Sequence, residues 1–130
     1  MDKRNPTIKL KGGRTLGYAE YGAPEGKPVF YFHGFPGSRI DWLFSDTNNT
    51  AAQLNARIIA VDRPGMGLSS FQRGREILDW SDDVIEIANV LQLDRFAVLC
   101  RFSGYMTTLS QVNVPPIFSR LITTPGALKK

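Results

Sequence analysis

Three short apolar runs, spaced along the first hundred residues, constrain the fold of this chain more than any other feature. They are PVFYF at residues 28–32, RIIAV at 57–61 and RFAVLC at 95–100. Each run is too short for a typical helix and is apolar on both faces, as expected of a strand that helices cover on two sides. Helical patterns lie between the runs. Strands that alternate with helices predict parallel crossovers and a doubly wound, mostly parallel sheet, which places the chain in the α/β class.

An N-terminal hairpin is predicted before the first of these strands. The stretches TIKL (7–10) and TLGYAEYG (15–22) are compatible with strands, and they flank the turn dipeptide Gly12-Gly13. Two strand-like runs joined by a short glycine turn are typical of a β-hairpin.

Two helices are predicted between the strands. The first spans residues 40–54 and is expected to be irregular around 45–49. The second spans residues 79–91, where Val84, Ala88 and Leu91 recur at helical spacing. Either Asp79 or Ser81 could cap the start of this second helix, and the acidic residues of its first turn favour the positive end of the helix dipole.

The pattern changes abruptly after Cys100. Residues 101–130 contain Pro115-Pro116 and Pro125-Gly126, many serines and threonines, and no sustained helical period. No acidic residue follows Asp94. We therefore divide the chain into an ordered portion, residues 1–100, and a divergent tail, residues 101–130, that we expect to be poorly ordered. The abruptness suggests the hypothesis that the tail comes from a changed reading frame, an alternative exon or a truncated gene.

The charge distribution argues against nucleic acid as a partner. The net charge is +4, but residues 1–94 carry 11 basic and 12 acidic side chains, and the excess of cations lies in the tail. Residues 95–130 carry five scattered cations and no acidic residue, and cations without a basic stripe are typical of a solvated tail. No apolar run approaches the roughly 18 residues that span a bilayer, so we expect no membrane association and a cytoplasmic location. The single cysteine fits a reducing compartment.

Two loops follow the first and second of the predicted strands, and these are candidate sites of chemistry. Ligands of parallel sheets bind outside the carboxyl ends of the strands. HGFPGS follows the strand that ends at Phe32, and DRPGMGLSS follows the strand that ends at Val61. In this order and at this spacing, YAEYGAPEGKPVFYFHGFPGSR and IIAVDRPGMGLSS resemble the α/β-hydrolase family, and WSDDVIEIANVLQLD with RFAVL is similar to the segment that leads this family into its nucleophile turn. The resemblance covers about residues 7–99.

The resemblance implies a partial α/β-hydrolase fold and an oxyanion hole in the first loop. In the family, the backbone N–H of the residue after the His-Gly pair helps to bind the negative oxygen of a tetrahedral intermediate, and that residue here is Phe35, after His33-Gly34. Pro36 would fix the direction of the loop and Gly37 would permit its tight return. His33 would orient the loop without acting as a base. A histidine at the end of a strand can equally have a purely structural role, hydrogen-bonded to nearby backbone.

The residues of the second loop also have a purely structural interpretation. Asp62, Arg63, Gly65 and Gly67 are more often turn and helix-cap architecture than chemistry. The implied substrate is a small molecule with an ester, amide or epoxide-like bond. No cofactor and no metal are expected.

The nucleophile is where this sequence departs from the family. The family pattern is G-x-S-x-G, because a strained strand-to-helix turn requires small neighbours two residues before and after the nucleophile. The candidate here is Ser103, whose corresponding neighbours are Arg101 and Tyr105. The family also places an acid and then a histidine downstream, and this sequence contains neither after Asp94. Without a base, a serine hydroxyl is a weak nucleophile.

Two functional interpretations therefore remain open. The chain is either an incomplete or degenerate serine-type hydrolase, expected to be inactive as written, or a non-catalytic remnant that acts as a binding or dimerising module. If the strand at residues 95–100 is the last of the sheet, its outer side is an exposed edge, through which the chain could associate with a second copy.

Overall fold

The computed structural model describes residues 5–44, 47–101 and 118–123, and its centre is a single mixed sheet. The N-terminal hairpin is confirmed. β1 (Thr7–Lys9) pairs antiparallel with β2 (Thr15–Gly22), and the turn between them contains Gly13 at a φ of 88°, a backbone conformation that glycine adopts without strain.

The predicted parallel strands are confirmed too. β3 (Lys27–Phe32) lies between β4 (Ala56–Val61) and β5 (Phe96–Cys100) and is parallel to both. The hairpin joins this parallel part because β2 pairs antiparallel with β4. The strand order is β1-β2-β4-β3-β5-β6, so the fold is a mostly parallel α/β sheet with an N-terminal hairpin.

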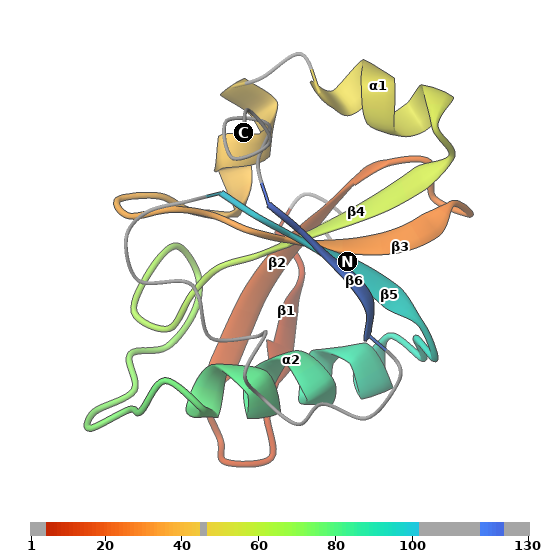
Figure 1. The fold of residues 1–130 in the computed structure, drawn as a ribbon. Helices are drawn as coiled ribbons and strands as arrows, with labels where there is room; N and C mark the ends of the chain where they lie inside the picture. Colours follow the sequence, from red (N-terminus) through yellow and green to blue (C-terminus); the bar gives the residue numbers. More distant parts are fainter. Residues whose placement is uncertain (1–4, 45–46, 102–117, 124–130) are drawn as a thin grey trace.

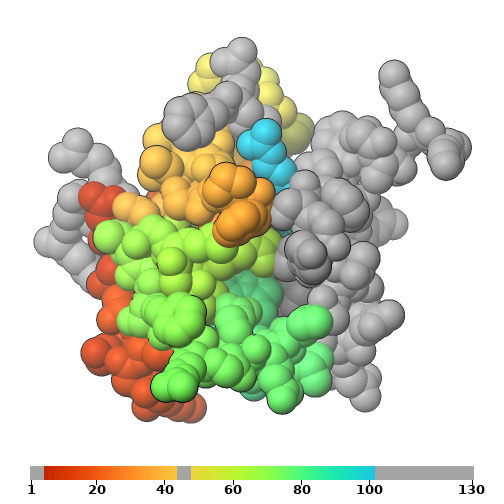
Figure 2. Space-filling model, turned by 90° about the vertical axis from the view of Figure 1, so that its left-hand side faces the viewer, coloured from red at the N-terminus to blue at the C-terminus, as the bar shows by residue number. Residues whose placement is uncertain are grey.

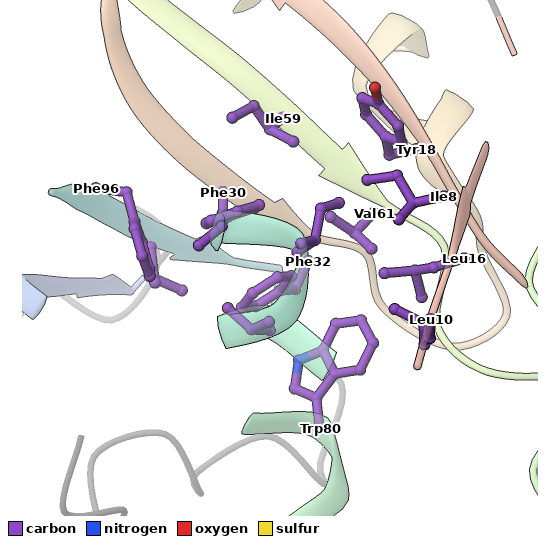
Figure 3. Packing of buried hydrophobic residues seen from close by; sticks show 14 of the residues in the cluster. Ile8, Leu10, Leu16, Tyr18, Phe30, Phe32, Ile59, Val61, Trp80 and Phe96 are labelled. Carbon is purple, nitrogen blue, oxygen red and sulfur yellow. The ribbon is translucent and has the colours of Figure 1, made fainter. Parts of the chain in front are cut away.

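Helical segments lie on both faces of the sheet, which explains why β3 is apolar on both sides. Figure 1 shows α2 (Asp79–Val90) on one side, and the 3₁₀ helix η1 (Arg39–Phe44) with α1 (Thr47–Gln53) on the other. Phe30 and Phe32 point toward α2, where the ring of Phe32 lies edge-on to Trp80 with centroids 5.1 Å apart (Figure 3). Tyr31 lies on the opposite face of the sheet, in a separate cluster of buried hydrophobic residues, and packs against Trp42 of η1.

Both helical regions differ in detail from the sequence prediction. The helix expected over residues 40–54 consists of η1 and α1, and residues 45–46 between them lie outside the described part of the chain. The predicted caps of α2 are wrong. The N-cap residue is Leu78, which makes no side-chain capping bond, and the Asp79 carboxylate accepts a 2.8 Å hydrogen bond from the N–H of Glu76 in the preceding turn.

The position expected for the sheet edge also differs. β6 (Phe118–Thr123) pairs parallel with β5, from Phe96↔Phe118 to Cys100↔Thr123. β5 is therefore an interior strand of the sheet. The prediction of an exposed edge at residues 95–100 is wrong, because six residues of the tail occupy that place. Residues 102–117 and 124–130 of the tail, for which we predict poor order, lie outside the described residues.

Candidate functional site

The two candidate loops lie next to each other at one end of the sheet. β3 and β4 are parallel neighbours whose last residues, Phe32 and Val61, are paired. The segment that leaves β3, residues 33–38 (the β3 loop), and the segment that leaves β4, residues 62–70 (the β4 loop), therefore start at the same carboxyl edge. Figure 2 looks onto this edge, with the orange β3 loop above the green β4 loop.

The imidazole of His33 is fully buried, and hydrogen bonds occupy both of its nitrogens. Nε2 accepts a 3.0 Å hydrogen bond from the backbone N–H of Arg63, and Nδ1 lies 2.7 Å from the carbonyl oxygen of Gly34. Because Nε2 is an acceptor, the proton of the neutral ring belongs on Nδ1, which donates to Gly34. Burial lowers the pKa of His33, and the Arg63 charge adds to this, although the hydrogen bond to Gly34 opposes it. His33 therefore binds the backbone of both loops, and its buried position favours the neutral form of the ring.

The side chain of Arg63 makes a second contact with His33. Its Nε donates a 2.8 Å hydrogen bond to the carbonyl oxygen of His33, and its guanidinium carbon lies 5.7 Å from the centre of the Trp80 ring, within the range of a cation–π contact. Burial lowers the pKa of Arg63 and raises the pKa of the buried Cys100 thiol. A thiol held in its protonated form is a poor nucleophile, so Cys100 is poorly suited to act as the nucleophile of this site.

A buried ion pair makes the second connection between the loops. Asp62 is fully buried and accepts hydrogen bonds from the backbone N–H of Arg39 (2.6 Å), from Nη1 of Arg39 (2.9 Å) and from the N–H of Leu68 (2.8 Å). Arg39 follows the β3 loop directly, at the start of η1. The carboxylate therefore fixes the end of the β3 loop and the course of the β4 loop at once.

Sequence reasoning missed Arg39 and Ser69 as parts of this arrangement. The hydroxyl of Ser69 donates to the carbonyl oxygen of Asp62 (2.7 Å) and accepts from the N–H of Gly17 (3.0 Å), which connects the β4 loop to β2. Neither residue carries a local signal. Gly17 lies far along the chain from Ser69, as Asp62 does from Arg39, and only the parallel packing of β3 and β4 brings Arg39 and Asp62 together.

Two glycines fit the site because side chains already fill the space around them. A Cβ at Gly37 would lie 2.3 Å from Asp41 Oδ2 and 2.7 Å from the carbonyl oxygen of Gly34. A Cβ at Gly67, where φ is 52°, would lie 2.1 Å from Asp62 Oδ2. Gly37 thus permits the tight return of the β3 loop through close packing, and Gly67 lets the β4 loop fold over the buried carboxylate.

The remaining predicted site residues divide into two groups. Gly34, Phe35 and Pro36 lie in the β3 loop at the carboxyl edge; the Phe35–Pro36 peptide is cis, and the Phe35 side chain is 72% exposed. Ser103, the candidate nucleophile, lies outside the described residues, so its position relative to these loops is still a prediction.

The described residues offer neither a metal site nor a membrane-spanning helix. They contain no group of three or more histidine, cysteine, aspartate or glutamate side chains that could hold a metal ion. Among the helices of the described ranges, none is long and apolar enough to cross a membrane.

Comparison with known sequences gives one curated relative and no family model. The chain is 32% identical over 107 residues to the dihydrolipoyllysine-residue acetyltransferase component of the acetoin cleaving system of Pseudomonas putida. The match covers 81% of this chain and 28% of that protein. No family model matches the sequence.

Solved structures resemble the fold over most of the chain. An α/β-hydrolase fold protein from Chitinophaga pinensis superimposes with a TM-score of 0.76 and 23% identity, covering 95% of this chain and 44% of that one. A predicted CIB-like hydrolase from Thermoplasma acidophilum gives 0.76 and 18%, with 92% and 61% covered. An epoxide hydrolase from Vigna radiata gives 0.64 and 21%, with 75% and 31% covered.

In each case the chain spans less than two thirds of the protein that it resembles. The predicted fold is thereby confirmed: the sheet of this chain has the architecture of part of an α/β-hydrolase fold.

Proposed function

We propose that this chain carries the oxyanion side of an α/β-hydrolase site and does not hydrolyse substrate with its own 130 residues. The reaction class is hydrolysis of an ester, amide or epoxide-like bond in a small molecule. One observation supports this most directly. The β3 loop lies at the carboxyl edge of the parallel strands and is held there by buried side chains, which is the preorganisation that oxyanion stabilisation needs.

The β3 loop would act through its backbone. In an acyl-transfer reaction, the carbonyl oxygen of the substrate becomes negative as the tetrahedral intermediate forms, and a fixed N–H donor stabilises it by roughly 3–4 kcal/mol. We assign that donor to the N–H of Phe35. His33, Gly34, Pro36 and Gly37 set the course of the loop around it. The curated relative is named as an acetyltransferase, and acyl transfer forms the same kind of oxyanion.

The missing part of the chemistry is proton transfer. A serine needs a base to remove its proton, and His33 is the single histidine in the sequence. Its Nε2 already accepts the N–H of Arg63, and its Nδ1 faces Gly34, so neither nitrogen is placed to serve a nucleophile. The chain therefore contributes binding and orientation but no base.

An ester assay tests this proposal. Purified protein is incubated with p-nitrophenyl acetate beside the Ser103→Ala variant, and both are treated with a fluorophosphonate probe that labels activated serines. We expect equal rates of p-nitrophenol release and no labelling of Ser103. Release that disappears in Ser103→Ala, or labelling at Ser103, would show a working nucleophile and overturn the proposal of inactivity.

A second candidate function is a binding or dimerising module. The observation that favours it is the sheet order, in which β6 has a strand neighbour on one side only among the described residues. Unpaired backbone groups of an outer strand can pair with another chain. Size-exclusion chromatography with light scattering checks this: a dimer at micromolar concentration would favour the module, and a monomer throughout would count against it.

A further inference from the structure

We infer that Arg63 and His33 form a latch that positions the β3 loop, and that the latch is closed only while the imidazole is uncharged. The latch consists of two hydrogen bonds in opposite senses. The backbone N–H of Arg63 donates to His33 Nε2 at 3.0 Å, and the Arg63 side chain donates through Nε to the His33 carbonyl oxygen at 2.8 Å. The inference rests on the proposed function for the role of the β3 loop.

The position of the latch makes it a control point for the loop. His33 is the first residue after β3, and Arg63 is the second residue after β4. The Arg63 side chain therefore runs back across the carboxyl edge and fixes the residue from which the β3 loop departs. The contact of Asp62 with Arg39 holds the far end of the same loop. With both ends fixed, the N–H groups between them have a set direction.

Protonation would open the latch for two physical reasons. A proton on Nε2 would oppose the N–H of Arg63, so that two donors would face each other where a donor and an acceptor now meet. The imidazolium would also place a positive charge beside the buried Arg63 guanidinium. Asp62 and Asp41 are the nearby carboxylates whose fields favour the charged ring, but burial and Arg63 oppose it. Asp62 is already engaged by Arg39, which reduces what it can offer to His33.

Trp80 holds the Arg63 side chain in place for this role. The guanidinium carbons of Arg63 and Arg75 lie 5.7 and 5.8 Å from the centre of the Trp80 ring. The hydrogen bonds described above join His33 to Arg63 and not to Arg75, so the two arginines share the ring contact but differ in the latch. Arg75 therefore provides a matched control for Arg63.

Nuclear magnetic resonance tests the latch directly, because the single histidine gives one set of ring signals. At pH 7.5, we expect the Nδ1–H tautomer and a scalar coupling across the hydrogen bond between Arg63 backbone N and His33 Nε2. On titration, we expect the coupling to disappear as the ring protonates, below pH 6.5. An Nε2–H tautomer, or a coupling that persists on the charged ring, would overturn the inference. Neither measurement needs a variant or a ligand, so the latch can fail while the proposed function stands, and the reverse.

Three variants separate the latch from general packing. Arg63→Met keeps the backbone donor and removes the side-chain bond and the charge, so we expect the pKa of His33 to rise and the Arg63 amide to exchange about tenfold faster, as the loss of one charged hydrogen bond allows. Arg75→Met should leave both values as in the wild type. Equal changes in the two variants would mean that stacking on Trp80, and not the latch, sets the behaviour of His33. Arg63→Lys keeps the positive charge but lacks the Nε donor. In this variant, we expect the pKa of His33 to stay as in the wild type, while the amide of residue 63 exchanges as fast as in Arg63→Met.

Discussion

The buried carboxylate of Asp62, paired with Arg39, fixes the positions of both loops at the carboxyl edge of the sheet. Asp62 has no contact with solvent, and three donors from two different segments converge on its carboxylate. Breaking a buried ion pair leaves its partner charged and desolvated, which costs about 3–5 kcal/mol. We therefore expect substitutions of this buried pair to disturb the site more than substitutions of exposed residues.

We expect Asp62→Asn to lower the free energy of unfolding by about 3–5 kcal/mol, because the largely buried Arg39 guanidinium would lose its counter-charge. The control is Glu20→Gln, which breaks the more exposed ion pair with Arg57 and should cost at most about 1 kcal/mol. Urea unfolding followed by tryptophan fluorescence measures both. Equal losses in the two variants would mean that the buried pair does not hold the loops.

Gly67 and Gly74 provide a second comparison at this scale. Both have positive φ, 52° and 65°, so alanine strains the backbone at either position by about 1–2 kcal/mol. Only at Gly67 would the new Cβ meet the Asp62 carboxylate; no atom lies within 4 Å at Gly74. We expect Gly67→Ala to cost at least about 2 kcal/mol more than Gly74→Ala, because it adds overpacking to the strain. A difference near zero in urea unfolding would show that the β4 loop can move away from Asp62.

At the scale of elements, β3 connects the core to the site. Its alternate side chains fill both faces of the sheet, and its end carries the β3 loop. Phe32 is the last residue of the strand, fully buried between Phe30 and Trp80, whereas Phe35 is three residues further along and 72% exposed. The change from buried core to exposed loop therefore takes place within three residues.

We expect Phe32→Ala to cost about 3–5 kcal/mol in the free energy of unfolding, since it empties a large volume against α2. Phe35→Ala should cost less than about 0.5 kcal/mol, as an exposed position does, and it retains the backbone N–H proposed as the oxyanion donor. Thermal unfolding compares the two. If Phe35→Ala is as destabilising as Phe32→Ala, its side chain has a structural role that its exposure does not indicate.

The elements that the sequence predicted correctly are those whose signal is local. An apolar run followed by a glycine-rich loop marks β3 and β4, because burial on both faces leaves a contiguous pattern. The predicted N-cap of α2 is wrong because the Asp79 carboxylate accepts a hydrogen bond from the N–H of Glu76 in the preceding turn. The sequence alone does not distinguish an acidic residue in this role from one that caps the helix. β6 was missed because its pairing with β5 depends on residues about twenty positions apart. The Arg39–Asp62 pair escaped prediction for the same reason.

At the scale of the whole molecule, the single histidine links the site to global stability. Burial and the charge of Arg63 hold the pKa of His33 in the folded chain below its ordinary value of 6.5. Above pH 6.5 the ring is neutral in both the folded and the unfolded chain, so its contribution to stability is complete and constant. Below pH 6.5 the unfolded chain binds a proton that the folded chain does not, and stability falls with pH until the folded pKa is reached.

We therefore expect the free energy of unfolding, measured by urea denaturation from pH 8 to pH 5, to be level above pH 6.5 and to fall below it. One proton limits the slope to about 1.4 kcal/mol per pH unit. His33→Gln removes this titration and should be flatter between pH 6.5 and 5, even if its stability at pH 8 is lower. Most carboxylates titrate below this window, near pH 4, so they contribute little to the difference between the two proteins. If both curves have the same slope, the buried imidazole is not excluding a proton, and the latch with Arg63 would have to hold a charged ring.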